Sequence, residues 1–132
     1  MGTEGYRLLH TMLRVGDVDA SVRFYTELMG MRELRRRDVP DGKYTLVFLG
    51  YGDEETHTVL ELTYNYGTTQ YEKGTGFGHL AVAVPDVYAA CDRLRAGGAT
   101  ISREPGPLKF GTVHIAFVED PDGYKIELVQ RA

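Results

Sequence analysis

Residues 10–21 read HTMLRVGDVDAS, and residues 79–90 read HLAVAVPDVYAA. Aligned at an offset of 69 residues, from 10 to 79, the two stretches are identical at positions 10/79, 15/84, 17/86, 18/87 and 20/89. Self-similarity at one fixed offset indicates an internal duplication. The chain is therefore expected to be built from two related halves.

The later parts of the two halves correspond as well. The same offset places LVFL, residues 46–49, beside IAFV, residues 115–118. An offset of 66, from 60 to 126, places LEL, residues 60–62, beside IEL, residues 126–128. Each half therefore begins with a strand that carries a histidine and ends with a strand that carries a glutamate.

Each half has the local signals of a strand, a helix and three further strands. Asp17 and Asp86 stand where helix N-caps are expected, and glycines follow both apolar helical stripes. The predicted helices cover residues 18–29 and 87–95. The predicted strands cover residues 10–15, 31–36, 44–51 and 58–64 in the first half, and 79–84, 100–102, 112–118 and 125–129 in the second. The sequence DPDG at 120–123 predicts a turn before the last strand.

The sequence thus predicts an α+β fold made of two tandem βαβββ modules. With 132 residues, the chain is expected to form a single domain, 1–132, with repeats at about 7–66 and 76–130. The Gly- and Thr-rich link around residues 68–78 is expected to separate repeats rather than independent domains.

The composition excludes several classes of function. Lys plus Arg is 15 against 19 for Asp plus Glu, and a net charge of -4 argues against a nucleic acid partner, since phosphate binding needs a basic face. No apolar run approaches the roughly 20 residues that span a bilayer, and the first five residues show no export signal. The single cysteine, Cys91, excludes an internal disulfide and a cysteine-rich zinc finger. We expect a cytoplasmic protein with no membrane partner.

Four residues with metal-binding chemistry stand at equivalent places in the two halves: His10, His79, Glu61 and Glu127. Each alone carries little weight, because a strand histidine is usually hydrogen-bonded or exposed and a glutamate between apolar neighbours simply faces solvent. A pseudo-twofold axis would bring both pairs together as nitrogen and oxygen ligands of a divalent metal ion, whose charge two carboxylates neutralise. His57 and His114 have no duplicate and are expected to be surface or strand histidines.

These residues and their surroundings resemble the vicinal oxygen chelate superfamily and, within it, the glyoxalase I family of lactoylglutathione lyases. The resemblance covers about Arg7 to Val129. The stretches that carry it are Leu9–Val15, Phe24–Tyr25, Leu60–Asn65, Gly76–His79 and Phe117–Leu128. The DPDG turn within the last of them occurs across the superfamily and is only moderately specific. The run ELTYN at 61–65, together with all four candidate ligands, favours glyoxalase I over the wider superfamily.

The resemblance implies a metal-dependent isomerase that converts the hemithioacetal of methylglyoxal and glutathione to S-lactoylglutathione. It also implies a homodimer with sites across the interface, where His10 and Glu61 of one subunit meet His79 and Glu127 of the other. By the same resemblance, Glu127 is the main catalytic base. Glu61 would serve the opposite face of the substrate or return the proton.

The resemblance assigns further residues to the glutathione. Arg14 matches a position that binds the glutamyl end, and a guanidinium suits a carboxylate because it can pair with both oxygens. Asn65 matches a second contact. Arg103 and Lys109 are candidate further contacts, and His79 is expected beside the substrate as well as on the metal.

Departures from the family pattern concern the metal and the thiol. His10 stands where zinc-using members often carry glutamine, and Thr75 where they carry arginine. The compact chain with His10 is similar to the bacterial type, so Ni²⁺ is expected, with Co²⁺ or Zn²⁺ as alternatives. Phe110 and His114 are bulkier than expected near the glutathione, which leaves another low-molecular-weight thiol open.

Two other interpretations stay open. One is a different enzyme on the same scaffold, such as an epimerase of methylmalonyl-CoA, although Arg14 and the ELTYN run weigh against it. Thiol transferases that inactivate fosfomycin and extradiol dioxygenases use three protein ligands rather than four. The other is a metal-free protein that sequesters a small molecule, as bleomycin-resistance proteins do, and the complete ligand set weighs against it.

Overall fold

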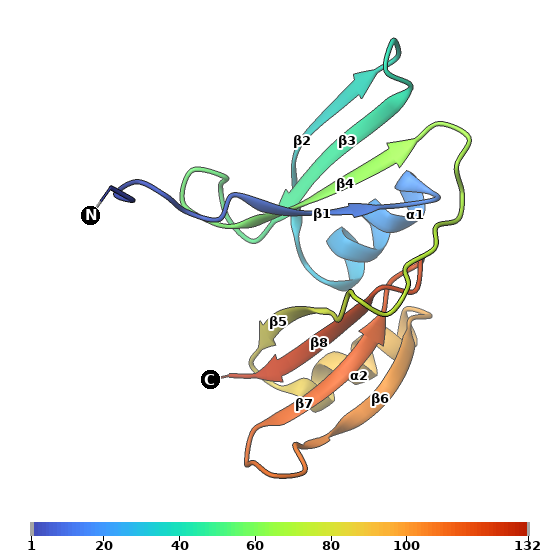
Figure 1. Ribbon diagram of the computed structural model, residues 1–132. Helices are drawn as coiled ribbons and strands as arrows, with labels where there is room; N and C mark the ends of the chain where they lie inside the picture. Colours follow the sequence, from blue (N-terminus) through green and yellow to red (C-terminus); the bar gives the residue numbers. More distant parts are fainter. Residues whose placement is uncertain (1, 132) are drawn as a thin grey trace. The chain divides into compact units, whose positions relative to one another are not determined.

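The computed structural model describes residues 2–131, which form eight strands, two α-helices and one π-helix (Figure 1). The chain divides into two units, with the division between Tyr71 and Glu72. That division falls inside the predicted link at residues 68–78. Among the described residues, no helix is long and apolar enough to cross a membrane.

The first unit contains a helical segment and a four-stranded mixed sheet. Its elements in chain order are β1 (His10–Arg14), α1 (Val18–Arg23), the π-helix η1 (Phe24–Leu28), β2 (Arg32–Val39), β3 (Tyr44–Gly50) and β4 (Val59–Asn65). The strand order is β1-β4-β3-β2, with β1 parallel to β4 and the other neighbours antiparallel. The βαβββ connectivity predicted from the sequence is confirmed.

The helical segment of the first unit covers one face of this sheet (Figure 1). It begins after Asp17, whose side chain accepts a 3.1 Å hydrogen bond from a backbone N–H of the first turn and so satisfies a donor that has no partner within the helix. The predicted helix is divided, because α1 passes into η1 at Phe24 and the N–H of Met29 donates to the Phe24 carbonyl. Both Phe24 and Tyr25 are buried there.

The core of the first unit lies between this helical segment and the sheet. Leu13, Val47 and Leu62 lie side by side on β1, β3 and β4 and are at most 4% exposed. Because side chains along a strand alternate between the two faces, Glu61, next to Leu62, points to the opposite, open face. The alternation of side chains that buries the core residues on one face of the sheet therefore places the candidate metal ligand Glu61 on the other face.

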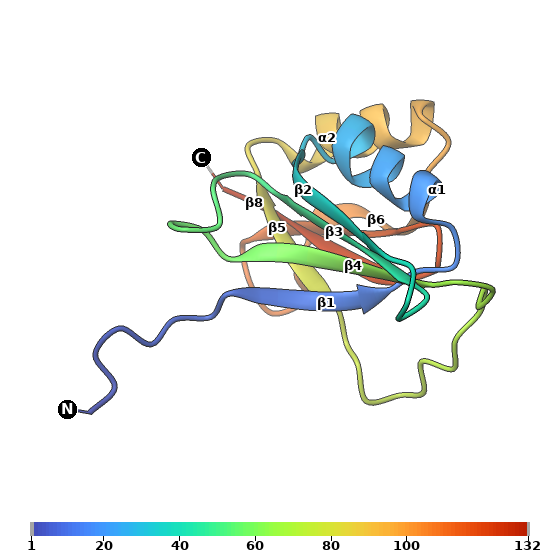
Figure 2. The ribbon, with the colours of Figure 1, turned by 90° about the horizontal axis from the view of Figure 1, so that it is seen from above.

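The second unit repeats this arrangement. Its elements are β5 (Leu80–Val84), α2 (Val87–Ala96), β6 (Thr100–Pro107), β7 (His114–Glu119) and β8 (Lys125–Gln130), with strand order β5-β8-β7-β6 and β5 parallel to β8. Asp86 caps α2 by accepting hydrogen bonds from two backbone N–H groups of the first turn. Helix α2 covers one face of its sheet (Figure 2) and buries Cys91 and Leu94.

Two strands are longer than the sequence indicates. β2 continues to Val39 and β6 to Pro107, beyond the predicted ends at 36 and 102. The added residues are mostly charged, Gly or Pro, yet they pair with β3 and β7, so cross-strand pairing overrides local propensity. β2 contains one register shift, just before Arg35, and β6 contains two, just before Arg103 and between Arg103 and Gly106.

Candidate active site

A histidine and a glutamate face each other on the open side of the first sheet. In the parallel pairing of β1 with β4, Met12 lies opposite Glu61, and His10 shares the face of Met12 because alternate residues of a strand point the same way. The Nε2 atom of His10 lies 3.0 Å from Oε1 of Glu61. The two side chains are 38% and 12% exposed, so a ligand can reach both.

The second unit contains the equivalent pair. The parallel pairing of β5 with β8 sets Ala81 opposite Glu127, and His79 lies immediately before β5. The Nε2 atom of His79 lies 3.4 Å from Oε1 of Glu127, and the side chains are 42% and 19% exposed. Within each half, the structure therefore brings together the two residues that the duplication singled out.

A phenylalanine packs edge-on against each of these histidines. The ring centroids of His10 and Phe48 lie 5.5 Å apart at 86°, and those of His79 and Phe117 lie 5.1 Å apart at 80°. Each phenylalanine lies opposite the glutamate of its pair in the sheet register. Both phenylalanines belong to the repeat, but the sequence analysis predicts no role for them. Their position at the common offset of 69 residues is the signal that could have indicated a shared role beside the histidines.

The donors of each pair fit a divalent metal ion. Two ligands at neighbouring corners of an octahedron, each about 2.1 Å from the ion, lie about 3 Å apart, close to the observed 3.0 and 3.4 Å. Imidazole nitrogen and carboxylate oxygen without thiolate suit Ni²⁺, Co²⁺ or Zn²⁺. Among the described residues of either unit, no third His, Cys, Asp or Glu joins the pair.

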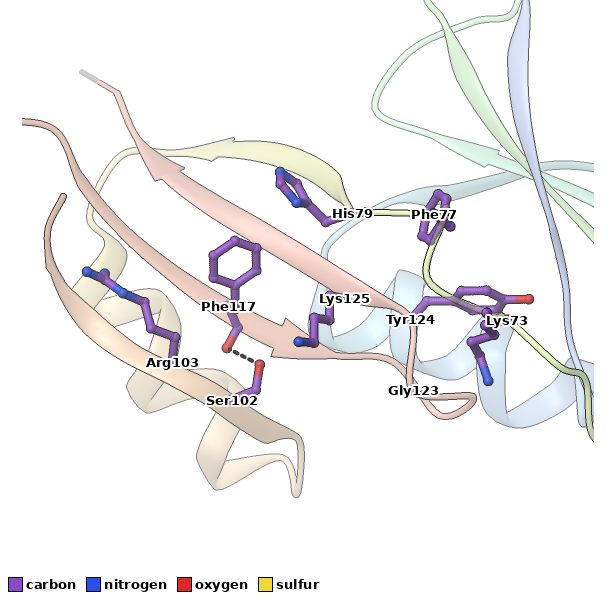
Figure 3. Close-up of a pocket in the computed structure, with 11 residues that line it drawn as sticks. Lys73, Phe77, His79, Ser102, Arg103, Phe117, Gly123, Tyr124 and Lys125 are labelled. Atoms are coloured by element: carbon purple, nitrogen blue, oxygen red, sulfur yellow. Dashed lines mark hydrogen bonds between the residues drawn. The ribbon is translucent and has the colours of Figure 1, made fainter. Parts of the chain in front are cut away.

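A pocket of about 490 Å³ lies beside His79 in the second unit (Figure 3). Residues from β6, β7 and β8, from the turn before β8 and from the segment before β5 line it. Lys73, Arg103 and Lys125 bring positive charge to the pocket, and its described lining includes no Asp or Glu. Such a pocket favours a ligand with a negative charge.

A tight turn positions the aromatic wall of this pocket. Asp120 is 5% exposed, and its Oδ1 accepts 2.9 Å hydrogen bonds from the backbone N–H groups of Asp122 and Tyr124, which closes the predicted turn. The Nζ of Lys73 lies 5.1 Å from the centroid of the Tyr124 ring. Phe77 packs edge-on against the same ring at 5.9 Å. The turn thus holds the segment before β5 at the pocket (Figure 3).

Arg14 and Asn65 lie in the first unit, on the strands that carry the first pair. Arg14 is exposed at the end of β1, on the face of His10. Asn65 ends β4, on the face of Glu61, and its Nδ2 donates a 3.1 Å hydrogen bond to the Tyr71 hydroxyl. Both residues therefore lie on the same open face as the first His–Glu pair, four residues further along the two parallel strands.

Arg103 and Lys109 have different surroundings. Arg103 lines the pocket, but its guanidinium donates hydrogen bonds of 2.9 to 3.1 Å to backbone carbonyls, those of Gly106, Pro107 and Ile115. Lys109 is exposed in the β6–β7 loop and is not among the residues that line the pocket. The sequence alone predicts neither the hydrogen bonds of Arg103 to backbone carbonyls nor the position of Lys109 outside the pocket lining.

The bulky residues Phe110 and His114 and the unduplicated His57 are not among the residues that line the pocket. Phe110 is 94% exposed in the β6–β7 loop. His114 begins β7, and its Nδ1 shares a 2.8 Å hydrogen bond with the Tyr88 hydroxyl. His57 is exposed in the loop between β3 and β4. The two histidines are thus a strand residue and a surface residue, respectively.

The sequence of the chain matches a known protein family. A family model, that of the glyoxalase/bleomycin resistance protein/dioxygenase superfamily, matches residues 7–128, which is most of the chain. The chain belongs to this superfamily. Membership in this superfamily agrees with the two βαβββ units and with the resemblance drawn from the sequence.

Relatives within the superfamily carry a common activity in their names. A probable lactoylglutathione lyase of Vibrio cholerae is 60% identical over 125 residues, which is 95% of this chain and 91% of the relative. The crystal structure of glyoxalase I from Zea mays superposes with a TM-score of 0.93 at 56% identity. The superposition covers 96% of this chain and 45% of the maize chain, so this chain spans about half the length of the maize protein. The structure of a trypanothione-dependent glyoxalase I of Leishmania major superposes with a TM-score of 0.86 at 52% identity. This superposition covers 96% of this chain and 87% of the Leishmania chain.

Proposed function

We propose that this chain catalyses the lactoylglutathione lyase reaction, in which the hemithioacetal of methylglyoxal and glutathione is isomerised to S-lactoylglutathione. The observation that carries the proposal is the duplicated pair, His10 with Glu61 and His79 with Glu127, each on the open face of a sheet with an exposed histidine and a partly buried glutamate. The 60% identity to a probable lactoylglutathione lyase supports it. The reaction removes a reactive dicarbonyl, so the role is methylglyoxal detoxification.

The four side chains of the two pairs would hold one divalent ion. In the proposed homodimer, His10 and Glu61 of one subunit and His79 and Glu127 of the other supply two nitrogens and two oxygens. The two carboxylates balance the charge of the ion. When bound, such an ion stabilises the negative charge that develops on the substrate oxygens.

Glu127 is the proposed base. In the hemithioacetal, the carbon that bears sulfur and hydroxyl also carries the hydrogen to be moved. Glu127 takes this proton, the neighbouring carbonyl carbon gains a proton, and the hydroxyl proton passes to the former carbonyl oxygen, so the reaction is balanced. Glu61, at the equivalent place, would serve the opposite face of the substrate or return the proton.

The charges on the two open faces fit glutathione, which carries two carboxylates. Arg14 and Asn65 in the first unit are the proposed contacts of the glutamyl end. The pocket of the second unit is the proposed site of the glycyl carboxylate, since Lys73, Arg103 and Lys125 line it. The guanidinium of Arg103 is already bonded to three carbonyls, so the two lysines are the main charges available to a ligand.

Two finer assignments belong to the proposal. Ni²⁺ is the favoured ion because the compact chain with His10 resembles the bacterial, nickel- or cobalt-activated type of the family, and Co²⁺ and Zn²⁺ are the alternatives that the same donors suit. The cytoplasm is the proposed location, because the reaction needs glutathione with its thiol reduced, as it is kept there.

Activity of metal-stripped protein tests the proposal. Methylglyoxal and glutathione would be preincubated to form the hemithioacetal, and Ni²⁺, Co²⁺ or Zn²⁺ would be added back separately. We expect little activity without metal and formation of the thioester when Ni²⁺ is restored. Restoration by Zn²⁺ alone would keep the reaction and overturn the assignment of nickel. No thioester with any of these ions would contradict the proposed function.

A further inference from the structure

A chain of contacts connects the His10 imidazole with a charged pair at the edge of the first sheet. The ring of Phe48 is 4% exposed and packs edge-on against His10 at 5.5 Å. On the same ring lies a guanidinium, since the Cζ atom of Arg35 is 3.7 Å from the ring centroid. Phe48 is therefore held between a cation and the imidazole.

Arg35 is itself fixed by a two-point ion pair. Its Nε and Nη2 atoms donate to the two carboxylate oxygens of Glu54 at 2.7 and 3.1 Å. This hydrogen bonding holds the pKa of Glu54 below its ordinary range. Arg7 also donates a 2.5 Å hydrogen bond to the Glu54 carbonyl. Both the side chain and the backbone of Glu54 are thus anchored.

A β-bulge places Arg35 over the ring. The pairing of β2 with β3 goes from Glu33 opposite Leu49 directly to Arg35 opposite Phe48, so Leu34 is the extra residue. A register shift of one residue exchanges the faces of a strand, and bulges often redirect a side chain beside an active site. Without the bulge, Leu34 rather than Arg35 would lie opposite Phe48.

The second sheet contains the equivalent β-bulge, but the arginine that follows it makes different contacts. Its register shift sets Arg103 opposite Phe117, the ring that packs against His79. The guanidinium of Arg103 is directed to backbone carbonyls, whereas that of Arg35 pairs with Glu54 across the Phe48 ring. The arrangement around His10 is therefore specific to the first unit.

We propose that Arg35, held by Glu54, is a positioning residue that fixes the Phe48 ring and through it directs the His10 imidazole toward Glu61. Its importance for catalysis rests on the proposed function, in which His10 is a metal ligand. The orientation of the His10 ring does not rest on it and can be measured in metal-free protein. The Arg35 side chain is 53% exposed, so it is not itself a buried core residue and can be substituted.

Nitrogen NMR of the histidine rings tests the proposal in metal-free protein at a fixed neutral pH. The chain has four histidines, so their ring signals can be assigned with single His→Gln variants. In Arg35→Ala, we expect the His10 signals to shift and broaden while those of His79 stay in place. Arg35→Lys keeps the charge but lacks the planar fork, so it should not restore them. Glu54→Gln should act in the same direction.

Arg36→Ala is the matched control. Arg36 follows Arg35 on β2 and pairs with Glu33 at 2.9 Å and with Asp19 at 3.9 Å, so its removal also costs one arginine and its surface ion pairs. We expect this variant to leave the His10 signals unchanged. A His10 response as large as that of Arg35→Ala would overturn the proposal.

Kinetics and metal binding give a second readout. In Arg35→Ala, we expect Ni²⁺ affinity and kcat to fall about tenfold, as for other residues that orient a ligand, with little change in KM. A higher KM at unchanged kcat would make Arg35 a substrate contact and overturn the positioning role, as would His10 signals that do not move. If wild-type protein proves inactive with every ion, the proposed function fails, while the ring signals still decide the role of Arg35.

Discussion

Glu61 and Glu127 occupy equivalent places but differ in their surroundings. Glu61 is 12% exposed, and the pKa of the nearby Arg35 guanidinium is raised, mainly by its hydrogen bond to Glu54 and to a smaller extent by the charge of Glu61. Glu127 is 19% exposed, and its neighbours His79 and Lys125 line a pocket. A carboxylate that moves a proton must reach the substrate. His79, 3.4 Å from Glu127, lines this pocket, so a ligand bound there would lie close to the His79–Glu127 pair, which supports the assignment of Glu127 as the base.

Glu127→Gln is expected to lose turnover by on the order of 10³, the scale of general base catalysis. The amide has nearly the same shape as the carboxylate but cannot accept the proton. The measurement is kcat with the Ni²⁺-loaded variant. Glu104→Gln, which breaks only a surface pair with Arg95, is the control and should keep full activity. Wild-type turnover in Glu127→Gln would refute the assignment.

Lys125→Gln is expected to raise KM for the glutathione hemithioacetal about tenfold, with a smaller effect on kcat. Its charge is proposed to bind the glycyl carboxylate to a similar extent in the ground state and the transition state, so its loss should change KM more than kcat. The measurement compares glutathione with its glycyl ethyl ester. For the ester, the variant and the wild type should have the same KM. An equal rise for both substrates would show that Lys125 does not bind that carboxylate.

The site residues differ in how far the sequence predicts them. The four candidate ligands were found because the same residue types recur at the offsets of the duplication. Lys73 reaches the pocket only through the packing of its segment on Tyr124, which no local pattern indicates. Arg35 faces Phe48 only because of a bulge. Contacts that depend on a register shift or on a loop path have no periodic signal in the sequence.

At the scale of elements, the pattern predicts where strands and helices start better than where they end. Both helix starts were found, because Asp17 and Asp86 are N-caps with a side-chain mechanism. The ends of β2 and β6 were placed too early, since their pairing with neighbouring strands, not their own propensity, extends them. The π-helical turn in η1 likewise has no simple sequence signal.

The ion pair between β2 and the β3–β4 loop predicts a pH-dependent difference in stability. Arg35 lowers the pKa of Glu54 in the folded state, so the pair stabilises the fold above the unfolded pKa of glutamate, about 4.3. That contribution is lost as the pH falls through the lowered folded pKa. Denaturant unfolding of wild type and Glu54→Gln should therefore differ at pH 7, by less than about 1 kcal/mol for an exposed pair.

The same comparison at about pH 3 provides the contrast. We expect the difference between wild type and Glu54→Gln to shrink there, because Glu54 takes up a proton and no longer pairs with Arg35. A difference that grows toward acid pH would mean that Glu54 is stabilised in its protonated form, which contradicts the ion pair.

At the scale of the whole molecule, the proposed function makes each of the two duplicated units supply half of a metal site. The sequence predicts the two βαβββ modules and the pair of donors in each, because both follow from strand periodicity and the repeat. Which copies of the two units supply one metal centre does not follow from periodicity. That assignment comes from the resemblance to glyoxalase I, and it makes a prediction about mixed dimers.

Subunit mixing tests the shared metal centre most directly. His10→Ala and Glu127→Gln would be prepared separately, and each is expected to be inactive, because each homodimer has two damaged sites. After unfolding and refolding together, a mixed dimer with sites across the interface has one intact site. Random pairing should then restore roughly a quarter of wild-type activity. Refolded mixtures that stay inactive, while wild type treated in the same way recovers, would contradict a site shared between two subunits.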